Sequence, residues 1–312
     1  MQTRETLAHV PVAPVTCVAP EEERRSIAAL LAGASIELSP SDPAEIDACD
    51  GLIEPGTAVY ISMPPGQTWH GTVALAARLR RRGLRPVPHI AARRIASRAA
   101  LDEYLARVAG EAGVDTALVI AGDSKRASGP FDSSLALLET GAFQRNGIVR
   151  VGVGGYPEGH PQIPTAALDA ALAEKKNLAR RTGLDLHVVT QFCFEAEPVL
   201  SWTTRMKARG LPVHVGVAGP ASLPRLLRYA ALCGIGNSVR VLKARPHAIA
   251  RLMIETGPET MLRQLARHAG PPISGIHFFS FGGLLRTARW LRAVQQGRFD
   301  LTEDGGFRVG AA

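Results

Sequence analysis

The sequence predicts one α/β domain of the (β/α)8 TIM-barrel class that spans residues 1–312. Eight short runs rich in valine, isoleucine and aromatic residues recur along the chain, and segments with helical spacing of Ala, Leu and Arg separate them. Several runs, such as Ala117–Ile120, are apolar without alternation, as expected for parallel strands covered on both faces. Eight strand–helix units in about 250 residues match a closed barrel.

An open doubly wound sheet is the alternative architecture. Such a sheet normally carries a glycine-rich phosphate-binding turn after its first strand. The first predicted strand instead ends in Glu37-Leu38-Ser39-Pro40, which has no glycine. A closed barrel therefore explains the pattern better.

The predicted strands follow one another along the whole chain. They are Ser35–Leu38, Ala58–Ser62, Arg85–Ile90, Thr116–Ala121, Ile148–Val153, His187–Phe194, Val213–Val217 and Gly275–Phe281. Apolar residues recur at helical spacing in the segments between them, for example in Thr72–Arg82, Ala99–Glu111, Ala166–Arg181 and Leu223–Leu232. A glycine stands where each of four helices is expected to end, at Gly83, Gly113, Gly183 and Gly210.

The longest gap lies between the seventh and eighth predicted strands. Extra helices are expected there at about residues 224–270, around Pro224–Cys233, His247–Glu255 and Pro258–His268. A short C-terminal extension, residues 298–312, carries the turn Asp304-Gly305-Gly306 between short apolar pieces. That pattern predicts a hairpin.

Composition narrows the class of protein. With 46% hydrophobic and 21% charged residues, the 312-residue chain can form one large core. No apolar stretch approaches the roughly 18 residues of a membrane span, and no basic start followed by an apolar run marks a signal peptide. The cysteines are scattered without metal-type spacing, so we expect a reducing, cytoplasmic setting with neither a disulfide framework nor a metal site: Cys17, Cys49, Cys193 and Cys233.

The formal net charge of +8 raises the question of an anionic partner. Much of the excess lies in arginines of one predicted helix and the strand after it: Arg78, Arg80, Arg81, Arg82 and Arg85. We interpret them as a solvated basic face, with attraction of an anionic small molecule as the alternative. No nucleic-acid-binding motif accompanies them, so no nucleic-acid partner is expected.

Polar residues stand at the predicted strand ends, which face the active site of a barrel. Glu37 lies in an otherwise apolar run, so we expect a half-buried acid with a raised pKa; an internal salt bridge or a bound water is the alternative. His89 ends the third strand and is either a core or a site histidine. Gly122 permits close backbone approach, and Asp123 can accept hydrogen bonds from a heterocycle unless it caps the next segment.

The loop Gly154–Pro161 after the fifth strand is the most informative segment. Glycines and prolines fix its irregular course, and it carries an aromatic ring, a carboxylate and an imidazole: Tyr156, Glu158 and His160. The sixth strand ends with Gln191 among aromatic residues, which suits a flat ligand, whereas Cys193 is expected in the core. The eighth strand ends in aromatic residues, and Gly282-Gly283 follows them. Phe279 and Phe281 are two residues apart and so face the same side of the strand, and we expect at least one of them to have a packing role only.

The predicted strand ends and the loops after them contain no Ser-His-Asp arrangement, zinc-ligand spacing or phosphate-binding loop. They offer one acid, a carboxylate and an amide for hydrogen bonding, aromatic faces and accessible glycine backbone. Such a pocket suits planar ring systems, one of which brings the chemistry.

At these residues the sequence resembles the methylenetetrahydrofolate reductase family. The run Gly155–Pro161 looks like the family's loop after strand five, Thr190-Gln191-Phe192 its strand-six end, Gly122-Asp123 its strand-four end and His277-Phe278-Phe279 its strand-eight opening. Ser35-Ile36-Glu37 corresponds to the segment that bears the family's acid. The similar segments occur in the same order over about residues 30–290.

The resemblance implies an FAD-dependent barrel enzyme that interconverts 5,10-methylene- and 5-methyltetrahydrofolate by hydride transfer. It implies that Glu37 is the acid that protonates the folate, and that Asp123, Gln191 and Phe279 bind this substrate. The implied FAD site includes Asp123 as well, with the following residues: His89, Gly122, Tyr156, His160 and either Lys175 or Lys176 at the phosphates. NADH, NADPH or a partner protein would donate the electrons.

The sequence departs from the family pattern at three strand ends. After the first strand, Leu38-Ser39-Pro40-Ser41 stands where the family has aromatic residues and paired prolines. Ala121 stands where the family has an arginine before the Gly-Asp pair, and Gly282-Gly283 replaces an Asn-Arg pair, for which Arg286 is the nearest substitute. We therefore expect a divergent branch whose electron donor and oligomeric state stay open. Two alternatives also stay open: a flavin-free, folate-dependent methyltransferase or demethylase component, and a non-catalytic partner subunit.

Overall fold

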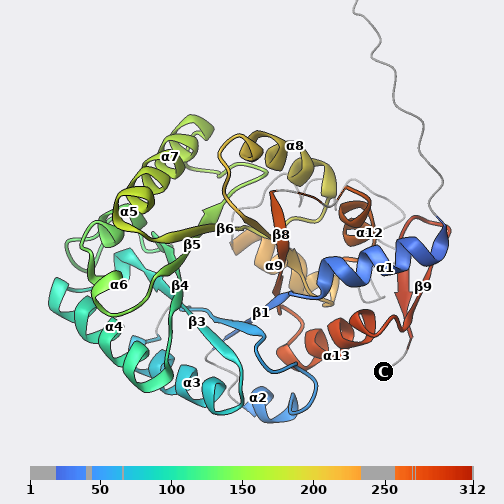
Figure 1. Cartoon of the computed structure of the whole chain (residues 1–312), viewed down its shortest axis with the longest axis horizontal. Helices are drawn as coiled ribbons and strands as arrows, with labels where there is room; N and C mark the ends of the chain where they lie inside the picture. Colours follow the sequence, from blue (N-terminus) through green and yellow to red (C-terminus); the bar gives the residue numbers. More distant parts are fainter. Residues whose placement is uncertain are drawn as a thin grey trace, which may run out of the picture.

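The chain forms a closed barrel of eight parallel strands, as the sequence predicts. The computed structural model describes residues 19–39, 44–64, 67–232, 257–268, 270 and 272–310. Each strand pairs with the next, and β8 pairs with β1 to close the ring (Figure 1). The strands are β1 (Ser35–Leu38), β2 (Ala58–Ile61), β3 (Arg85–Ala91), β4 (Thr116–Ile120), β5 (Arg150–Gly155), β6 (Asp185–Thr190), β7 (Val213–Ala218) and β8 (Ile273–Phe279).

Helices surround this ring (Figure 1). In chain order they are α1 (Pro20–Leu31), α2 (Ala44–Ala48), α3 (Trp69–Arg81), η1 (Ala92–Arg94), α4 (Arg98–Ala112), α5 (Ser134–Leu138), α6 (Ala142–Arg145), α7 (Thr165–Thr182), α8 (Ala196–Lys207), α9 (Leu223–Leu232), α12 (Glu259–Arg267) and α13 (Leu284–Gln295). No helix among the described residues is long and apolar enough to cross a membrane.

The two-residue period of each strand divides its side chains between an outer and an inner core. In β2, Val59 and Ile61 pack outward into the large core beneath the helices. Tyr60, between them, belongs to a small inner cluster with Val87, Leu118 and Val189. The inner face of the strands therefore carries the residues that can shape a site.

Three predicted strand ends were placed wrongly. β8 ends at Phe279 rather than Phe281, because the backbone turns at Ser280 and Phe281 packs with Phe192 in a separate cluster. β5 continues to Gly155 rather than ending at Val153, because a side chain at Gly155 would lie 2.6 Å from Val188 and its absence lets β5 run close to β6. β6 ends at Thr190 rather than Phe194, since the backbone turns there and Phe192 packs into a separate small cluster.

Other local predictions are confirmed. Gly113 and Gly183 end α4 and α7 in the left-handed conformation, with φ of 58° and 73°. The C-terminal extension forms the antiparallel hairpin β9 (Phe299–Leu301) and β10 (Phe307–Val309). Cys193 is a buried free thiol, as is Cys49. The predicted helix His247–Glu255, Cys17 and Cys233 lie outside the described residues.

Arginines in α3 and directly after it pair with other groups of the protein. Arg78 and Arg82 pair with Asp47, and Arg82 also pairs with Asp50 at 3.0 Å. Arg80 donates to the carbonyls of Ala112 and Gly113 at the end of α4. These contacts fasten α3 to its neighbours, which explains part of the basic composition without an anionic ligand.

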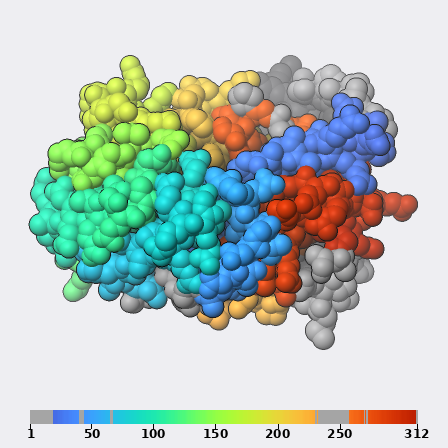
Figure 2. Space-filling view, turned by 60° about the horizontal axis from the view of Figure 1, so that its bottom comes forward, coloured from blue at the N-terminus to red at the C-terminus, as the bar shows by residue number. Residues whose placement is uncertain are grey.

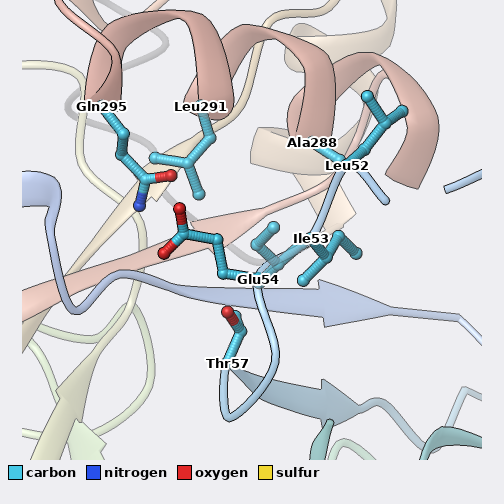
Figure 3. A pocket seen from close by; sticks show the side chains of 8 residues that line it. Leu52, Ile53, Glu54, Thr57, Ala288, Leu291 and Gln295 are labelled. Carbon is cyan, nitrogen blue, oxygen red and sulfur yellow. The ribbon is translucent and has the colours of Figure 1, made fainter. Parts of the chain in front are cut away.

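A small pocket lies beside the N-terminal half of β1 (Figure 3). Its polar groups are few: Glu54, Thr57 and Gln295, whose amide donates to the carbonyl of Leu31 at 2.9 Å. It lies away from the strand ends that carry the predicted site residues and offers no grouped chemistry.

A buried ion-pair cluster joins the two ends of the described chain; we call it the terminal seam (Glu23, Arg263 and Arg267). Glu23 of α1 accepts two hydrogen bonds from Arg263 of α12, at 2.9 and 3.0 Å, and a third from Arg267. Arg263 also donates to the carbonyls of Thr302 and Gly306 in the C-terminal hairpin. Figure 2 shows α1, in blue, lying against the red C-terminal segments.

Arg263→Met should lower the free energy of unfolding by about 2 kcal/mol. The reason is that Glu23, whose side chain is 6% exposed, would lose its main partner while the hairpin carbonyls lose their donor. Denaturant titration monitored by circular dichroism measures the loss. Arg25→Met is the matched control on α1: Arg25 pairs with Glu21 in solvent, with side chains 80% and 85% exposed, so less than about 0.5 kcal/mol should be lost.

The loss of unfolding free energy caused by Arg263→Met should depend on pH. The hydrogen bond from Arg263 and, after it, the one from Arg267 hold the pKa of Glu23 below its ordinary value. A lowered pKa in the folded state stabilises the protein above the ordinary glutamate range, and this contribution is lost as the pH falls through the folded-state pKa. Equal losses for Arg263→Met and Arg25→Met at neutral pH would contradict a stabilising seam.

Candidate functional site

Parallel closure brings all eight C-terminal strand ends to one side of the barrel, which we call the mouth. Residues from separate parts of the sequence meet there, since neighbouring strands pair in register from Glu37 beside Tyr60 to Gly216 beside His277. The mouth is the usual position of the active site in this architecture.

Glu37 of β1 points into the barrel just below the mouth. Its side chain is 16% exposed, and its Oε2 lies 3.6 Å from Nε2 of His89 and 3.7 Å from Nε2 of His277. Burial raises the pKa of the Glu37 carboxyl above its ordinary value. This is the environment that the sequence predicts for a general acid.

The two histidines beside Glu37 are neutral near pH 7. Burial lowers the pKa of His89 to about 4 and that of His277 to about 3. Neutral imidazoles do not draw the proton from the carboxyl as a guanidinium or an ammonium would. An internal salt bridge, the alternative for Glu37, would need a protonated imidazole at His89 or His277, and burial opposes that protonation.

The orientation of His277 is set from the adjacent strand. Its Nδ1 lies 2.9 Å from the hydroxyl of Ser35, its register partner on β1, which leaves Nε2 directed toward Glu37. His277 is fully buried, and Ser35 is buried beside it. His89, which the resemblance assigns to the cofactor site, is only 7% exposed and lies beside Glu37 and Tyr60 rather than in the outer loops.

Asp123 lies at the rim of the mouth with an arginine that the sequence analysis missed. Its side chain is 65% exposed and pairs at 2.6 Å with Arg94 from η1, which is 14% exposed and also donates to the carbonyl of Met63. Arg94 thus brings a guanidinium to the end of β4 from the loop after β3, while the chain has Ala121 at the position where the family pattern has an arginine. The pair Arg93-Arg94 directly after the third strand was the available signal.

The backbone before Asp123 requires glycine. Gly122 has a φ of +88°, and a side chain there would approach Cβ of Ala91 to 3.1 Å. No helix follows Asp123 until Ser134, so Asp123 does not serve as a helix cap.

The loop after β5 presents two rings against the mouth. Tyr156 and His160 meet edge to face, with ring centroids 5.3 Å apart. The hydroxyl of Tyr156 lies over Gly154, where a side chain would approach it to 3.2 Å. The glycine at the end of β5 therefore makes room for the tyrosine ring.

An aromatic wall follows the ends of β6 and β8 and is completed from α9; it is made of Phe192, Phe194, Tyr229, Phe279 and Phe281. Phe192 contacts Phe279 at 5.4 Å and Phe281 at 4.7 Å between ring centroids, and Phe281 stacks on Tyr229 at 4.3 Å. Gln191 lies at the base of the wall, with its side-chain oxygen accepting a hydrogen bond of 3.1 Å from the backbone of Phe192. Tyr229 was missed because it belongs to α9 rather than to a strand end.

The two lysines of α7 are placed differently. The amino group of Lys176 donates to the carbonyl of Arg209, beyond the C-terminal end of α8. That of Lys175 lies 3.4 Å from the carbonyl of Ala171, one turn nearer the start of α7, and burial lowers its pKa. Arg286 lies in the first turn of α13.

A sequence model of the family described as methylenetetrahydrofolate reductase matches residues 58–283. The matched segment begins after Glu37, so the role of that residue depends on the geometry above. Similar solved structures include a mandelate racemase/muconate lactonizing enzyme from Bordetella bronchiseptica (15% identity, TM-score 0.44), with alignment over 88% of this chain and 63% of that one. A dihydropteroate synthase from Thermus thermophilus is 14% identical with a TM-score of 0.42, and the alignment covers 84% of this chain and 92% of that one. A deoxyribose phosphate aldolase from Aeropyrum pernix is 15% identical with a TM-score of 0.45, and the alignment covers 86% of this chain and 97% of that one.

Glu37→Gln should stabilise the protein at alkaline pH and change little at acidic pH. A raised folded-state pKa means that the stability contributed by the neutral carboxyl is lost as the pH rises from the unfolded toward the folded value. Glutamine stays neutral, so the variant should gain about 1.4 kcal/mol over the parent for each pH unit in that window. Denaturant titrations across the pH range measure the gain.

The exposed carboxyl of Glu54 provides the control. Glu54→Gln should show no such pH-dependent gain, because solvent hydrates that carboxylate in both states. A Glu37→Gln protein that tracks its parent at every pH would contradict a raised pKa.

Proposed function

Since the chain belongs to the methylenetetrahydrofolate reductase family, we propose that it interconverts 5,10-methylene- and 5-methyltetrahydrofolate, with Glu37 as the acid. The observation that carries the proposal is the largely buried Glu37 carboxyl between His89 and His277 near the barrel mouth, whose pKa burial raises. Reduction breaks one carbon–nitrogen bond of the methylene bridge. The carbon gains a hydride and the departing nitrogen gains a proton, which Glu37 is placed to give.

The pterin ring is proposed to lie between the rim and the aromatic wall. Asp123 and Gln191 would hydrogen-bond its polar edge, and Phe279 would contact its face. Arg94 holds the Asp123 carboxylate through one oxygen, which leaves the other oxygen to accept from the ligand. The polar groups therefore fix the orientation of a ligand that the aromatic rings bind.

The residues around Tyr156 also fit the ring system of FAD, which we propose as the cofactor. Tyr156 and His160 supply a ring face and edge, and Gly122 gives the chain before Asp123 the positive φ that turns it at the strand end. Lys175 is the better candidate for the phosphates, because the Lys176 amino group is held at Arg209. A bound flavin would supply the hydride. NADH, NADPH or a partner protein would reduce it.

Anaerobic assays of the purified protein with methylenetetrahydrofolate and either NADH or NADPH should yield 5-methyltetrahydrofolate. Glu37→Gln should lower kcat by about a hundredfold to ten-thousandfold while the dissociation constant for 5-methyltetrahydrofolate changes little, because the proton is needed for the reaction and not for binding. Glu54→Gln, at the pocket of Figure 3, should retain parental kcat.

Unchanged kcat in Glu37→Gln would eliminate the acid assignment. An absorbance band near about 450 nm, bleached by the donor, is expected if the protein carries flavin. A colourless protein that binds the folate but does not reduce it would favour the methyltransferase, demethylase or partner-subunit alternatives.

Arg94→Met should weaken 5-methyltetrahydrofolate binding about tenfold, since Asp123 would lose the partner that holds its carboxylate in place. Isothermal titration calorimetry measures the dissociation constant. Arg98→Met, four residues along on the exposed start of α4, should bind the ligand like the parent. Parental affinity in Arg94→Met would remove Arg94 from the site.

A further inference from the structure

Ionisable side chains extend from Glu37 through the inside of the barrel. Layers of branched apolar residues normally fill this space. Here the inner faces of the strands carry a set that we call the polar column: Glu37, His89, His277, Tyr60, His187 and His214. His89 and His277 flank Glu37, whereas His187 and His214 lie near the N-terminal starts of β6 and β7.

Tyr60 connects the two halves of the column. Its backbone is the register partner of Glu37, and its ring centroid lies 4.5 Å from that of His277. Its hydroxyl reaches 3.3 Å from Nε2 of His187, whose ring centroid is 5.1 Å from that of His214. Tyr60 thus contacts His277 through its ring and His187 through its hydroxyl, and a water at the unpartnered Nε2 of His277 would complete the step between that hydroxyl and the acid.

Glycines on neighbouring strands make room for the lower pair. A side chain at Gly152 would lie 2.9 Å from Nε2 of His187, and one at Gly275 would lie 3.6 Å from Nδ1 of His214. The strands thus lack side chains on the side where the imidazoles lie. Any larger residue at position 152 would displace His187 from Tyr60.

The column has polar atoms placed to bind water between its members. Glu37 Oε2, His89 Nε2, His277 Nε2 and His214 Nδ1 are buried and have no protein hydrogen-bond partner. Buried polar atoms of this kind are the usual sites of ordered water in protein interiors. One water between neighbours would convert the 3.6–3.7 Å separations at Glu37 into hydrogen-bonded steps.

The lower end of the column lies close to solvent. His187 and His214 are half-buried, and the charges that face His187 are those of Arg85 and Arg150, at the first residues of β3 and β5. The upper end lies below the mouth, which a bound folate would cover. Solvent at the N-terminal end is then the nearest proton source that the ligand does not block.

We propose that the polar column carries protons between Glu37 and solvent at the N-terminal end of the barrel, so that Glu37 regains its proton while ligand covers the mouth. The inference rests on the proposed function. One proton enters from solvent for each proton that Glu37 gives to the folate nitrogen, and each group in between releases one proton as it accepts another. No electrons are transferred along the column.

The ionisation of the column suits such a relay. Burial lowers the pKa of His187 and His277 to about 3, and burial also lowers that of His214. Burial also raises the pKa of Tyr60. All these groups are neutral near pH 7, so each imidazole has one proton to give and one lone pair to accept another.

The test measures proton uptake and product formation in the same single turnover. A pH-indicator dye in weakly buffered solution follows uptake, and rapid quenching follows 5-methyltetrahydrofolate. In the parent, uptake should coincide with product formation. In Tyr60→Phe, which keeps the ring contacts but loses the link to His187, product should form at a rate close to the parent's while uptake lags about tenfold and coincides with product release.

Two further variants separate the relay from packing. His187→Ala should show the same lag in proton uptake. Added imidazole should remove this lag by occupying the space of the missing ring. Leu118→Val, which trims the same inner cluster without touching the column, should keep uptake and product formation together. Coincident uptake in both Tyr60→Phe and His187→Ala would overturn the proposal. Failure of the proposed function would look different, since the parent itself would then form no 5-methyltetrahydrofolate.

Discussion

Closure of the barrel forces the inner side chains of eight strands into one narrow, poorly hydrated space. Every polar group placed there must remain neutral or bring its own partner, because an isolated charge would lose its hydration. Burial raises the pKa of Glu37, which favours its protonated form, and lowers the pKa of His89 and His277, which favours their neutral imidazoles. The same desolvation that raises the pKa of Glu37 makes it a usable acid, so the fold and the chemistry share one cause.

The sequence predicted the parts of the structure that depend on local pattern. Apolar runs located all eight strands, and Glu37 was identified because a carboxylate interrupts one such run. Strand ends were less certain where glycine or phenylalanine has two uses: Gly155 extends β5 because two strands approach closely there, while Phe192 leaves β6 for the aromatic wall. Local pattern does not distinguish these uses, since both depend on the neighbouring strand.

Contacts across strands account for what the sequence did not predict. Arg94 reaches Asp123 from the preceding loop, and Tyr60 reaches His187 across the inside of the barrel, 127 residues along the chain. Tyr60 looks like an ordinary β-strand residue in its run, and only the register of β1 with β2 places it beside Glu37. The terminal seam is of the same kind, because Glu23 and Arg263 are 240 residues apart. The charged start of α1 after Pro20 indicated a helix but not its partner.

Charge is distributed through the molecule according to hydration. Formally charged pairs lie where solvent reaches them, as with Asp123 and Arg94 at the rim, or where several hydrogen bonds replace the water, as in the terminal seam. Among the described residues, burial favours the neutral forms of the polar column inside the barrel. An arginine or lysine beside Glu37 would lower the pKa of the carboxyl and leave a carboxylate that has no proton to give. Histidine and tyrosine avoid this, because they carry transferable protons without adding a fixed charge, and this explains why they, and not stronger bases, accompany the acid inside the barrel.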